Sequence, residues 1–63
     1  MLKLIDYFDT DTGQNYAIIY DGELSHDERR QAVLAFTPCG IIPHPKGDIF
    51  VVAVDSTWTP PKL

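Results

Sequence analysis

The sequence has little cysteine, few cations and no long apolar run, and each of these shortages excludes a class of protein. The single cysteine among 63 residues rules out an intramolecular disulfide framework and indicates a reducing, cytoplasmic compartment. The longest apolar run, residues 49–54, is far shorter than the roughly 20 residues that span a membrane. We also expect no signal peptide, because Asp6 interrupts the apolar start of the chain.

Cations are outnumbered, since five lysines and arginines stand against nine aspartates and glutamates, for a formal net charge of -4. Nucleic-acid binding needs a cationic surface that neutralises phosphates. The two adjacent arginines, Arg29 and Arg30, follow directly after Asp27 and Glu28 and form no such surface. The charge argues against nucleic-acid binding and favours a protein partner with a basic surface.

The chain is short for a domain that folds alone. Ordering each residue costs on the order of 1.5 kcal/mol, which nearly cancels what so small a core returns. An apolar fraction of 44% and a charged fraction of 22% are ordinary for a globular domain and argue against disorder. We therefore predict one domain over residues 1–55, followed by an extended, proline-rich tail over residues 56–63.

Two segments rich in aromatic and branched residues, 2–8 and 15–20, predict β-strands. The residues between them are turn formers, with Gly13 available for a positive φ, so the two strands predict a β-hairpin. A symmetric pairing about that turn places four pairs opposite each other: Ile5 with Ile18, Tyr7 with Tyr16, Leu4 with Ile19, and Asp6 with Ala17.

A helix is predicted over residues 26–36. Ser25 and Glu28 have the spacing of a capping box, in which each side chain accepts a hydrogen bond from the backbone N–H of the other residue. Pro38 and Gly40 follow the last helical residues and end the helix.

Two more extended segments follow the helix. Ile41 and Ile42 form a short edge strand that Pro43 interrupts, and a Pro-Lys-Gly-Asp turn leads into a strand over residues 49–54. The predicted order is β-β-α-(β)-β, with the short strand in parentheses optional. This is an α+β fold in which a small antiparallel sheet has one helix packed on one face.

Residues 49–54 are apolar without interruption, although successive side chains of a strand point to opposite faces of the sheet. Because the side with Ile5, Tyr7 and Ile18 carries no acid, we assign this side to the helix. The apolar residues on the opposite side have a simpler explanation, since single aliphatic side chains are common on protein surfaces. A slip of one residue in the strand pairing would exchange the two faces. The bare face is predicted to be Leu4, Ala17, Ile19, Ile49, Val51 and Ala53, with Asp6 and Asp55 at its margin.

No motif identifies a reaction. Asp11-Thr12-Gly13 matches the D-T-G of aspartic proteases, but a hairpin turn is the better explanation in so short a chain. Cys39 and His44 supply at most half of a structural zinc site. We expect no enzyme activity, no bound metal and no cofactor.

Two further features are candidates for contact with a partner. Asp21 and Glu23 precede the helix and offer carboxylates to a basic surface, although a solvated acidic face explains them equally well. Trp58 stands in the tail, where it is either a hot spot for a partner or an anchor that folds back on the domain. The small core favours folding back.

These features favour a small acidic protein-binding module over an enzyme. Acidic, motif-free chains of this size are frequent among phage and mobile-element proteins that inhibit host enzymes, which suggests docking on a basic site of a host enzyme. The alternative is a homodimeric assembly protein that uses the bare face or an edge strand. The predicted contact residues are Leu4, Ile19, Val51, Asp21, Glu23 and Trp58.

Overall fold

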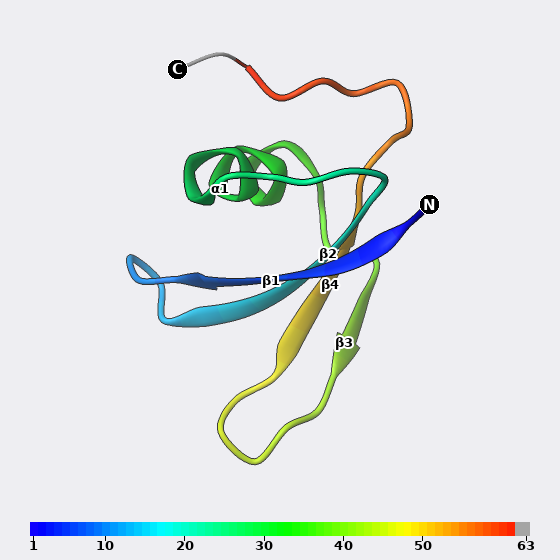
Figure 1. Cartoon of the computed structure of the whole chain (residues 1–63). Helices are drawn as coiled ribbons and strands as arrows, with labels where there is room; N and C mark the ends of the chain where they lie inside the picture. Colours follow the sequence, from blue (N-terminus) through cyan, green and yellow to red (C-terminus); the bar gives the residue numbers. More distant parts are fainter. Residues whose placement is uncertain (62–63) are drawn as a thin grey trace.

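The chain forms a four-stranded sheet with a helix on one side, over the residues 1–61 that the computed structural model describes (Figure 1). The strands lie in the order β1-β2-β4-β3. The predicted α+β class and element order are confirmed, including the short third strand. Residues 62–63, the end of the predicted tail, lie outside the described residues. In chain order the elements are β1 (Lys3–Asp9), β2 (Gln14–Tyr20), α1 (His26–Ala35), β3 (Gly40–Ile42) and β4 (Ile49–Ala53).

The N-terminal hairpin has the predicted register, and all four predicted pairs of residues are observed. Its turn contains a hydrogen bond of 2.7 Å from the N–H of Gly13 to the C=O of Asp9. Gly13 has a φ of 73°, a left-handed backbone conformation that residues other than glycine rarely adopt. The turn residues therefore fix which side chains of β1 and β2 share a face.

The sheet is mixed, which corrects the predicted antiparallel sheet. β1 and β2 are antiparallel, as are β3 and β4, but β4 runs parallel to β2, from the pair Asn15 and Ile49 to the pair Ile19 and Ala53. The reason is that β3 occupies the outer edge and returns the chain to the end of the sheet where β2 begins. β4 then starts beside the start of β2, after the long crossover through α1 that parallel neighbours require.

α1 begins at the predicted capping box. The N–H of Glu28 donates to Ser25 Oγ (3.2 Å), and the N–H of Ser25 donates to Glu28 Oε1 (2.8 Å). The helix ends at Ala35, one residue before the predicted end, because Phe36 has an extended backbone with a φ of -125°. Within residues 1–61, no helix is long and apolar enough to span a membrane.

The core lies between α1 and the sheet, on the side predicted for the helix. Tyr7 and Ile18 of the hairpin form a buried cluster with Leu24 and with Ala32 of α1. Val52 of β4 is also fully buried. Alternation along the strands therefore places apolar side chains under the helix from both the hairpin and the last strand.

The described part of the tail folds back toward the core. Asp55 starts a turn, in which its Oδ1 accepts a hydrogen bond from the N–H of Thr57 (2.9 Å) and its C=O accepts one from the N–H of Trp58 (3.0 Å). The indole of Trp58 packs edge-on against Phe36 and Tyr20, with ring centroids 5.6 and 6.2 Å away. Trp58 is thus an anchor on its own domain, as the small core favours.

Candidate functional site

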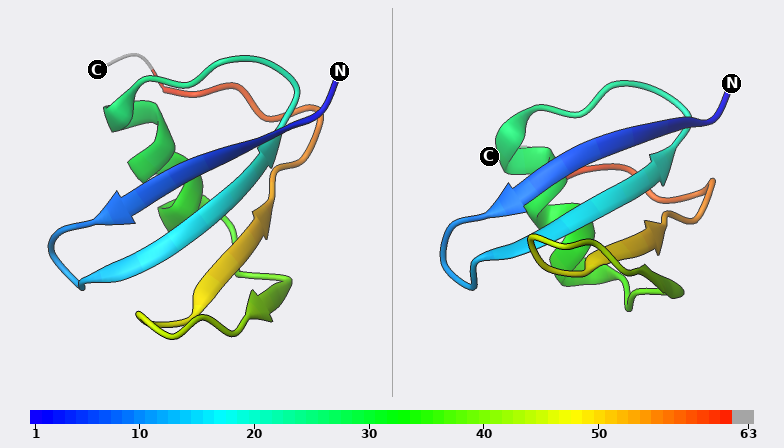
Figure 2. Two further views of the ribbon diagram at one scale, coloured as in Figure 1. Left: turned by 60° about the horizontal axis from the view of Figure 1, so that its bottom comes forward. Right: turned by 90° about the horizontal axis from the view of Figure 1, so that it is seen from below.

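α1 and the tail through residue 61 lie on one side of the sheet, and neither covers the opposite side (Figure 2). Strand pairing shows which side chains share this side, because paired residues point the same way and directions alternate along each strand. We call this side the open face, and it comprises Leu4, Asp6, Phe8, Asn15, Ala17, Ile19, Gly40, Ile42, Ile49, Val51 and Ala53.

The open face is mainly apolar, and its outer strands are the most exposed. Leu4 and Phe8 of β1 keep 68% and 49% of their surface accessible, and Ile42 of β3 keeps 49%. In the centre, Ala17 is buried although no element covers it, because its short side chain lies between the longer side chains of its neighbours Asp6 and Val51. The apolar surface therefore extends over all four strands.

The three predicted apolar contact residues, Leu4, Ile19 and Val51, all lie on the open face. Phe8 and Ile42 also lie on the open face and were not predicted there. Phe8 is four residues after Leu4, so alternation along the strand would have found it. Ile42 requires the register of β3 against β4, for which the sequence offers no signal.

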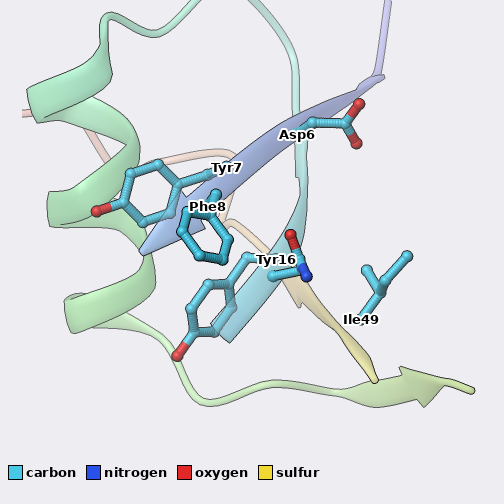
Figure 3. A pocket seen from close by; sticks show the side chains of 6 residues that line it. Asp6, Tyr7, Phe8, Tyr16 and Ile49 are labelled. Atoms are coloured by element: carbon cyan, nitrogen blue, oxygen red, sulfur yellow. The ribbon is translucent and has the colours of Figure 1, made fainter. Parts of the chain in front are cut away.

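A hollow of about 330 Å³ lies across β1, β2 and the start of β4. Figure 3 shows Asp6 and Ile49 on the side of the sheet away from α1, whereas Tyr7 points toward the helix. Phe8, Asn15 and Ile49 form one row of paired residues across the three strands. Asp6 lies two residues from Phe8, about 7 Å along the strand. The lining residues are Asp6, Tyr7, Phe8, Asn15, Tyr16 and Ile49.

Asp6 is the one charged residue of the open face in the part of the chain that the structure describes. Its neighbours on this side are Leu4 and Phe8 along the strand and Ala17 on β2. Asp6 lies midway along β1, and because β1 is an edge strand, Asp6 stands at one margin of the open face, as predicted. A carboxylate in such a position is hydrated in the free protein, and it needs a cation or hydrogen-bond donors when a partner covers it.

Both edges of the sheet are blunted against pairing with another strand. At β1, Arg29 Nη1 donates to the backbone C=O of Asp6 (3.1 Å) and Arg29 Nε donates to the C=O of Leu24 (3.0 Å). At the other edge, β3 is three residues long and stands between Pro38 and Pro43. A cation over a strand edge, and a short strand between prolines, both disfavour strand addition.

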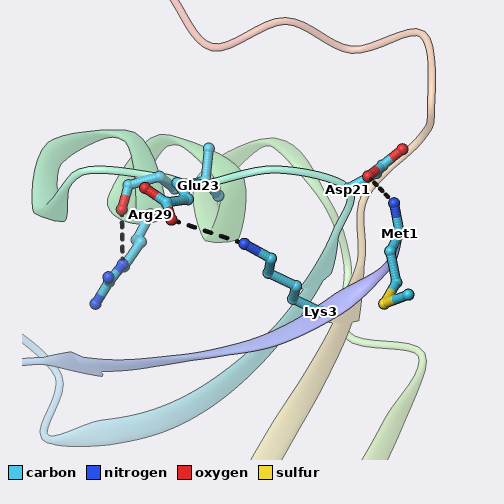
Figure 4. Close-up of polar contacts among 6 residues, drawn as sticks. Met1, Lys3, Asp21, Glu23 and Arg29 are labelled. Carbon is cyan, nitrogen blue, oxygen red and sulfur yellow. Dashed lines mark hydrogen bonds and ion pairs between the residues drawn. The ribbon is translucent and has the colours of Figure 1, made fainter.

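The two predicted acidic contact residues are engaged within the chain (Figure 4). Asp21 Oδ1 accepts a hydrogen bond from the amino group of Met1, and Glu23 Oε1 pairs with Lys3 Nζ at 3.7 Å. The hydrogen bond and the positive charge of that amino group lower the pKa of the Asp21 carboxyl from its ordinary value. Both acids lie between β2 and α1, and Trp58 packs against its own domain. The structure therefore does not bring these three residues together with the apolar three.

Asp11, Cys39 and His44 are the residues that were considered for catalysis or for a zinc site. Asp11 pairs with Arg30 (2.7 Å) in the hairpin turn, and His44 Nδ1 accepts a hydrogen bond from the N–H of Lys46 (3.1 Å). Asp11, Cys39 and His44 line neither the hollow on the open face nor a second hollow of about 340 Å³ beside the loop after β2. Among the described residues, no group of three or more His, Cys, Asp or Glu side chains could hold a metal ion.

The chain matches no protein-family model, no curated protein and no solved structure. The open face combines an apolar surface over four strands, a hollow on that surface, one carboxylate beside the hollow and a blunted sheet edge on either side. Together these features determine which kind of surface could pack against this side of the sheet.

Proposed function

We propose that this protein is a non-enzymatic binding module of the cytoplasm that docks through its open face on another protein. The observation that carries the proposal is the uncovered apolar surface, on which Leu4, Phe8 and Ile42 are about half exposed or more. Contiguous exposed apolar patches mark interaction sites. Covering such a patch contributes about 25 cal/mol for each Å² of apolar surface removed from water.

The size of the sheet sets what the open face contributes to an interface. Four strands about 4.8 Å apart span about 14 Å between the outer strand axes, which is enough for the centre of an interface. A standard interface removes about 800 Å² from each partner, so the surrounding loops supply the rim. Binding energy concentrates in large side chains near the centre. Leu4 and Phe8 are the largest exposed side chains of β1 on this face and are expected to contribute most.

The blunted edges favour docking by the face over strand addition. An incoming strand at β1 would have to displace Arg29 from the C=O of Asp6. One that approached β3 would find only three residues to pair with. Inhibition of an enzyme by covering a surface is one role that such face docking suits, because it needs no rearrangement of the module.

A homodimer packed through two open faces is the second candidate. Its supporting observation is the thin core, in which Ile18 and Val52 are the largest fully buried side chains of the described residues. A small domain gains stability when it buries further apolar area against a second copy. Sedimentation across a dilution series separates the candidates, since a tight dimer favours assembly and a monomer at micromolar concentration favours docking.

Leu4→Asp tests the docking face, with Leu34→Asp as a matched control. Both leucines are 68% exposed, but Leu4 lies on the open face and Leu34 lies on α1. The immobilised wild-type chain and each variant are compared for the proteins that they retain from a lysate of the cells that produce the chain. A carboxylate in an apolar interface costs more than about 1.4 kcal/mol. We therefore expect Leu4→Asp to retain at least about tenfold less of a protein that the wild-type chain retains. Leu34→Asp should retain as much of it as the wild-type chain does.

Val51→Asp repeats the test at the centre of the open face, and circular dichroism checks that each variant is folded. Equal retention by the wild-type chain, Leu4→Asp and Val51→Asp would contradict docking by this face. Loss of the fold in Leu4→Asp, but not in Leu34→Asp, would show that Leu4 stabilises the domain instead of a complex.

A further inference from the structure

Building on the proposed docking function, we propose that the hollow beside Asp6 receives a basic side chain of the partner protein, with arginine as the best fit. The hollow brings together a carboxylate from Asp6, an aromatic ring from Phe8, an amide from Asn15 and an aliphatic wall from Ile49. All four residues belong to the open face, so the hollow opens on the side from which a partner would approach.

Each of these groups matches one part of an arginine side chain. A carboxylate such as Asp6 accepts two parallel N–H bonds from the planar guanidinium fork. An aromatic ring such as Phe8 attracts a cation that lies over its face. The methylene stem of the arginine packs on Ile49 while its charged end stays with the polar groups. Lysine shares the charge but lacks the planar fork.

The size of the hollow fits one side chain. Its volume of about 330 Å³ lies at the lower end of the range of roughly 300–1,000 Å³ for small-molecule sites. An arginine that enters it would lie beside Leu4 and Phe8, which a partner covers at the same time. Exclusion of water from these neighbours strengthens the attraction between the guanidinium and the Asp6 carboxylate.

The same charge pattern argues against a second copy on this face. In the described part of the chain, the open face carries Asp6 and neither lysine nor arginine. Asp48 precedes β4 and Asp55 follows it closely, so further acids stand near both ends of that strand. Two copies, each with a net charge of -4, would repel and would bury Asp6 without a cation. A basic partner would instead be attracted to the acidic chain and would supply a cation for Asp6.

The test uses two capped tripeptides as probes, N-acetyl-Leu-Arg-Leu-amide and the same peptide with citrulline in place of arginine. Citrulline keeps the shape of the side chain and removes its charge. Each probe is titrated into the isotope-labelled full chain, and the backbone amide signals are followed by NMR. We expect the arginine peptide to shift the signals of Asp6, Phe8, Asn15 and Ile49. It should bind up to about fivefold more tightly than the citrulline peptide, which is the range for one exposed ion pair.

Asp6→Asn and Glu23→Gln form a matched pair of variants. Each removes one negative charge and keeps the shape of the side chain, but Asp6 lies beside the hollow and Glu23 lies on the loop after β2. We expect Asp6→Asn to abolish the preference for the arginine peptide. Glu23→Gln should retain the preference, because the net charge of the chain changes equally in both variants.

Three outcomes would overturn the basic-side-chain proposal: an arginine preference that survives in Asp6→Asn, shifts confined to Asp21 and Glu23, or no shift around the hollow at millimolar probe. None of them affects the retention test with Leu4→Asp, so docking by the open face and the role of Asp6 fail separately. A dimer that Leu4→Asp dissociates would also overturn the proposal, because it would assign the open face to a second copy.

Discussion

On the helix side of the sheet, Tyr7, Ile18 and Val52 are buried, whereas on the open face Leu4 and Phe8 of the same hairpin remain exposed. Tyr7, Leu4 and Phe8 come from the same strand, β1, and differ in the parity of their positions. The comparison separates two uses of apolar residues in one small domain. Those on the helix side form the core, and those on the open face are the contact residues of the proposed docking.

The reason for the difference is the size of the helix. α1 has ten residues and is therefore about 15 Å long, so it covers one face of a sheet whose four strands span about 14 Å. The tail adds Trp58 to the same side, against Phe36 and Tyr20. Neither α1 nor the tail through residue 61 covers the open face. Apolar residues on that face therefore stay accessible to water, and the proposed function assigns them to a partner.

The largest expected difference in stability is between alanine variants of the neighbours Ile18 and Ile19, whose side chains point to opposite faces. Ile18 is 0% exposed, so Ile18→Ala should lower the free energy of unfolding by about 3 kcal/mol. Ile19→Ala should cost less than about 1 kcal/mol, because Ile19 is only partly buried and leaves no enclosed cavity. Denaturant titration followed by circular dichroism measures both.

Because a loss of that size can unfold so small a domain, Ile18→Val serves as the milder variant and should cost about 1 kcal/mol. Equal destabilisation by Ile18→Ala and Ile19→Ala would contradict the difference between the helix side and the open face. It would mean that the open face is covered in solution and contributes to stability as the helix side does.

A second, smaller difference in stability is expected between alanine variants of two aromatic residues. These are Trp58 on the helix side and Phe8 on the open face. Trp58→Ala should lower the free energy of unfolding by about 2 kcal/mol, since the indole packs against Phe36 and Tyr20 but is not fully buried. Phe8→Ala should cost less than about 1 kcal/mol and should weaken retention of the partner instead. Stability and retention are measured on the same two variants.

Loss of partner retention in Trp58→Ala at full stability would reverse the assignment and make Trp58 the contact residue. Strong destabilisation by Phe8→Ala would place its ring in the core. Either result would show that the parity of the strands does not separate folding from binding in this domain.

The smallest expected effect is a pH dependence of the turn after β4, which holds Trp58. The Asp55 carboxylate accepts hydrogen bonds from the N–H and the hydroxyl of Thr57, which lowers its pKa from the ordinary value of 3.8. The folded chain therefore binds this proton less readily than the unfolded chain. The stabilisation is present above pH 3.8 and is lost as the pH falls through the lowered pKa.

Thr57→Val removes the hydroxyl donor and keeps the shape of the side chain. We expect the melting temperature of the wild-type chain to fall more steeply below about pH 4 than that of Thr57→Val, with tryptophan fluorescence as a second signal for the turn. Identical pH profiles would show that the hydroxyl of Thr57 does not stabilise the ionised form of Asp55.

Local patterns predicted most of the individual elements. The turn residues around Gly13 gave the hairpin its register, and the spacing of Ser25 and Glu28 gave the helix its start. Both features depend on interactions within a few residues of the chain. The same holds for the alternation that put Leu4 and Val51 on the bare face.

The candidate site was predicted less completely. Asp21 and Glu23 were predicted as contacts of a partner; in the structure both carboxylates remain exposed, pair with Met1 and Lys3, and do not belong to the open face. Asp6 was predicted at the margin of the bare face, but the hollow beside it was not predicted. The hollow depends on the pairing of β4 with the distant N-terminal hairpin, and composition alone does not reveal such pairing.

The sequence by itself determined the strands, the helix and the parity of their side chains, because turns, caps and alternation follow from neighbouring residues. Tertiary structure decided that β4 lies parallel to β2 and that β3 closes the far edge. It thereby decided that Ile49 joins Phe8 and Asn15 around one hollow. The physical reason is that strand order depends on how the crossover through α1 buries the helix side, which is a contact between distant segments and has no local signature.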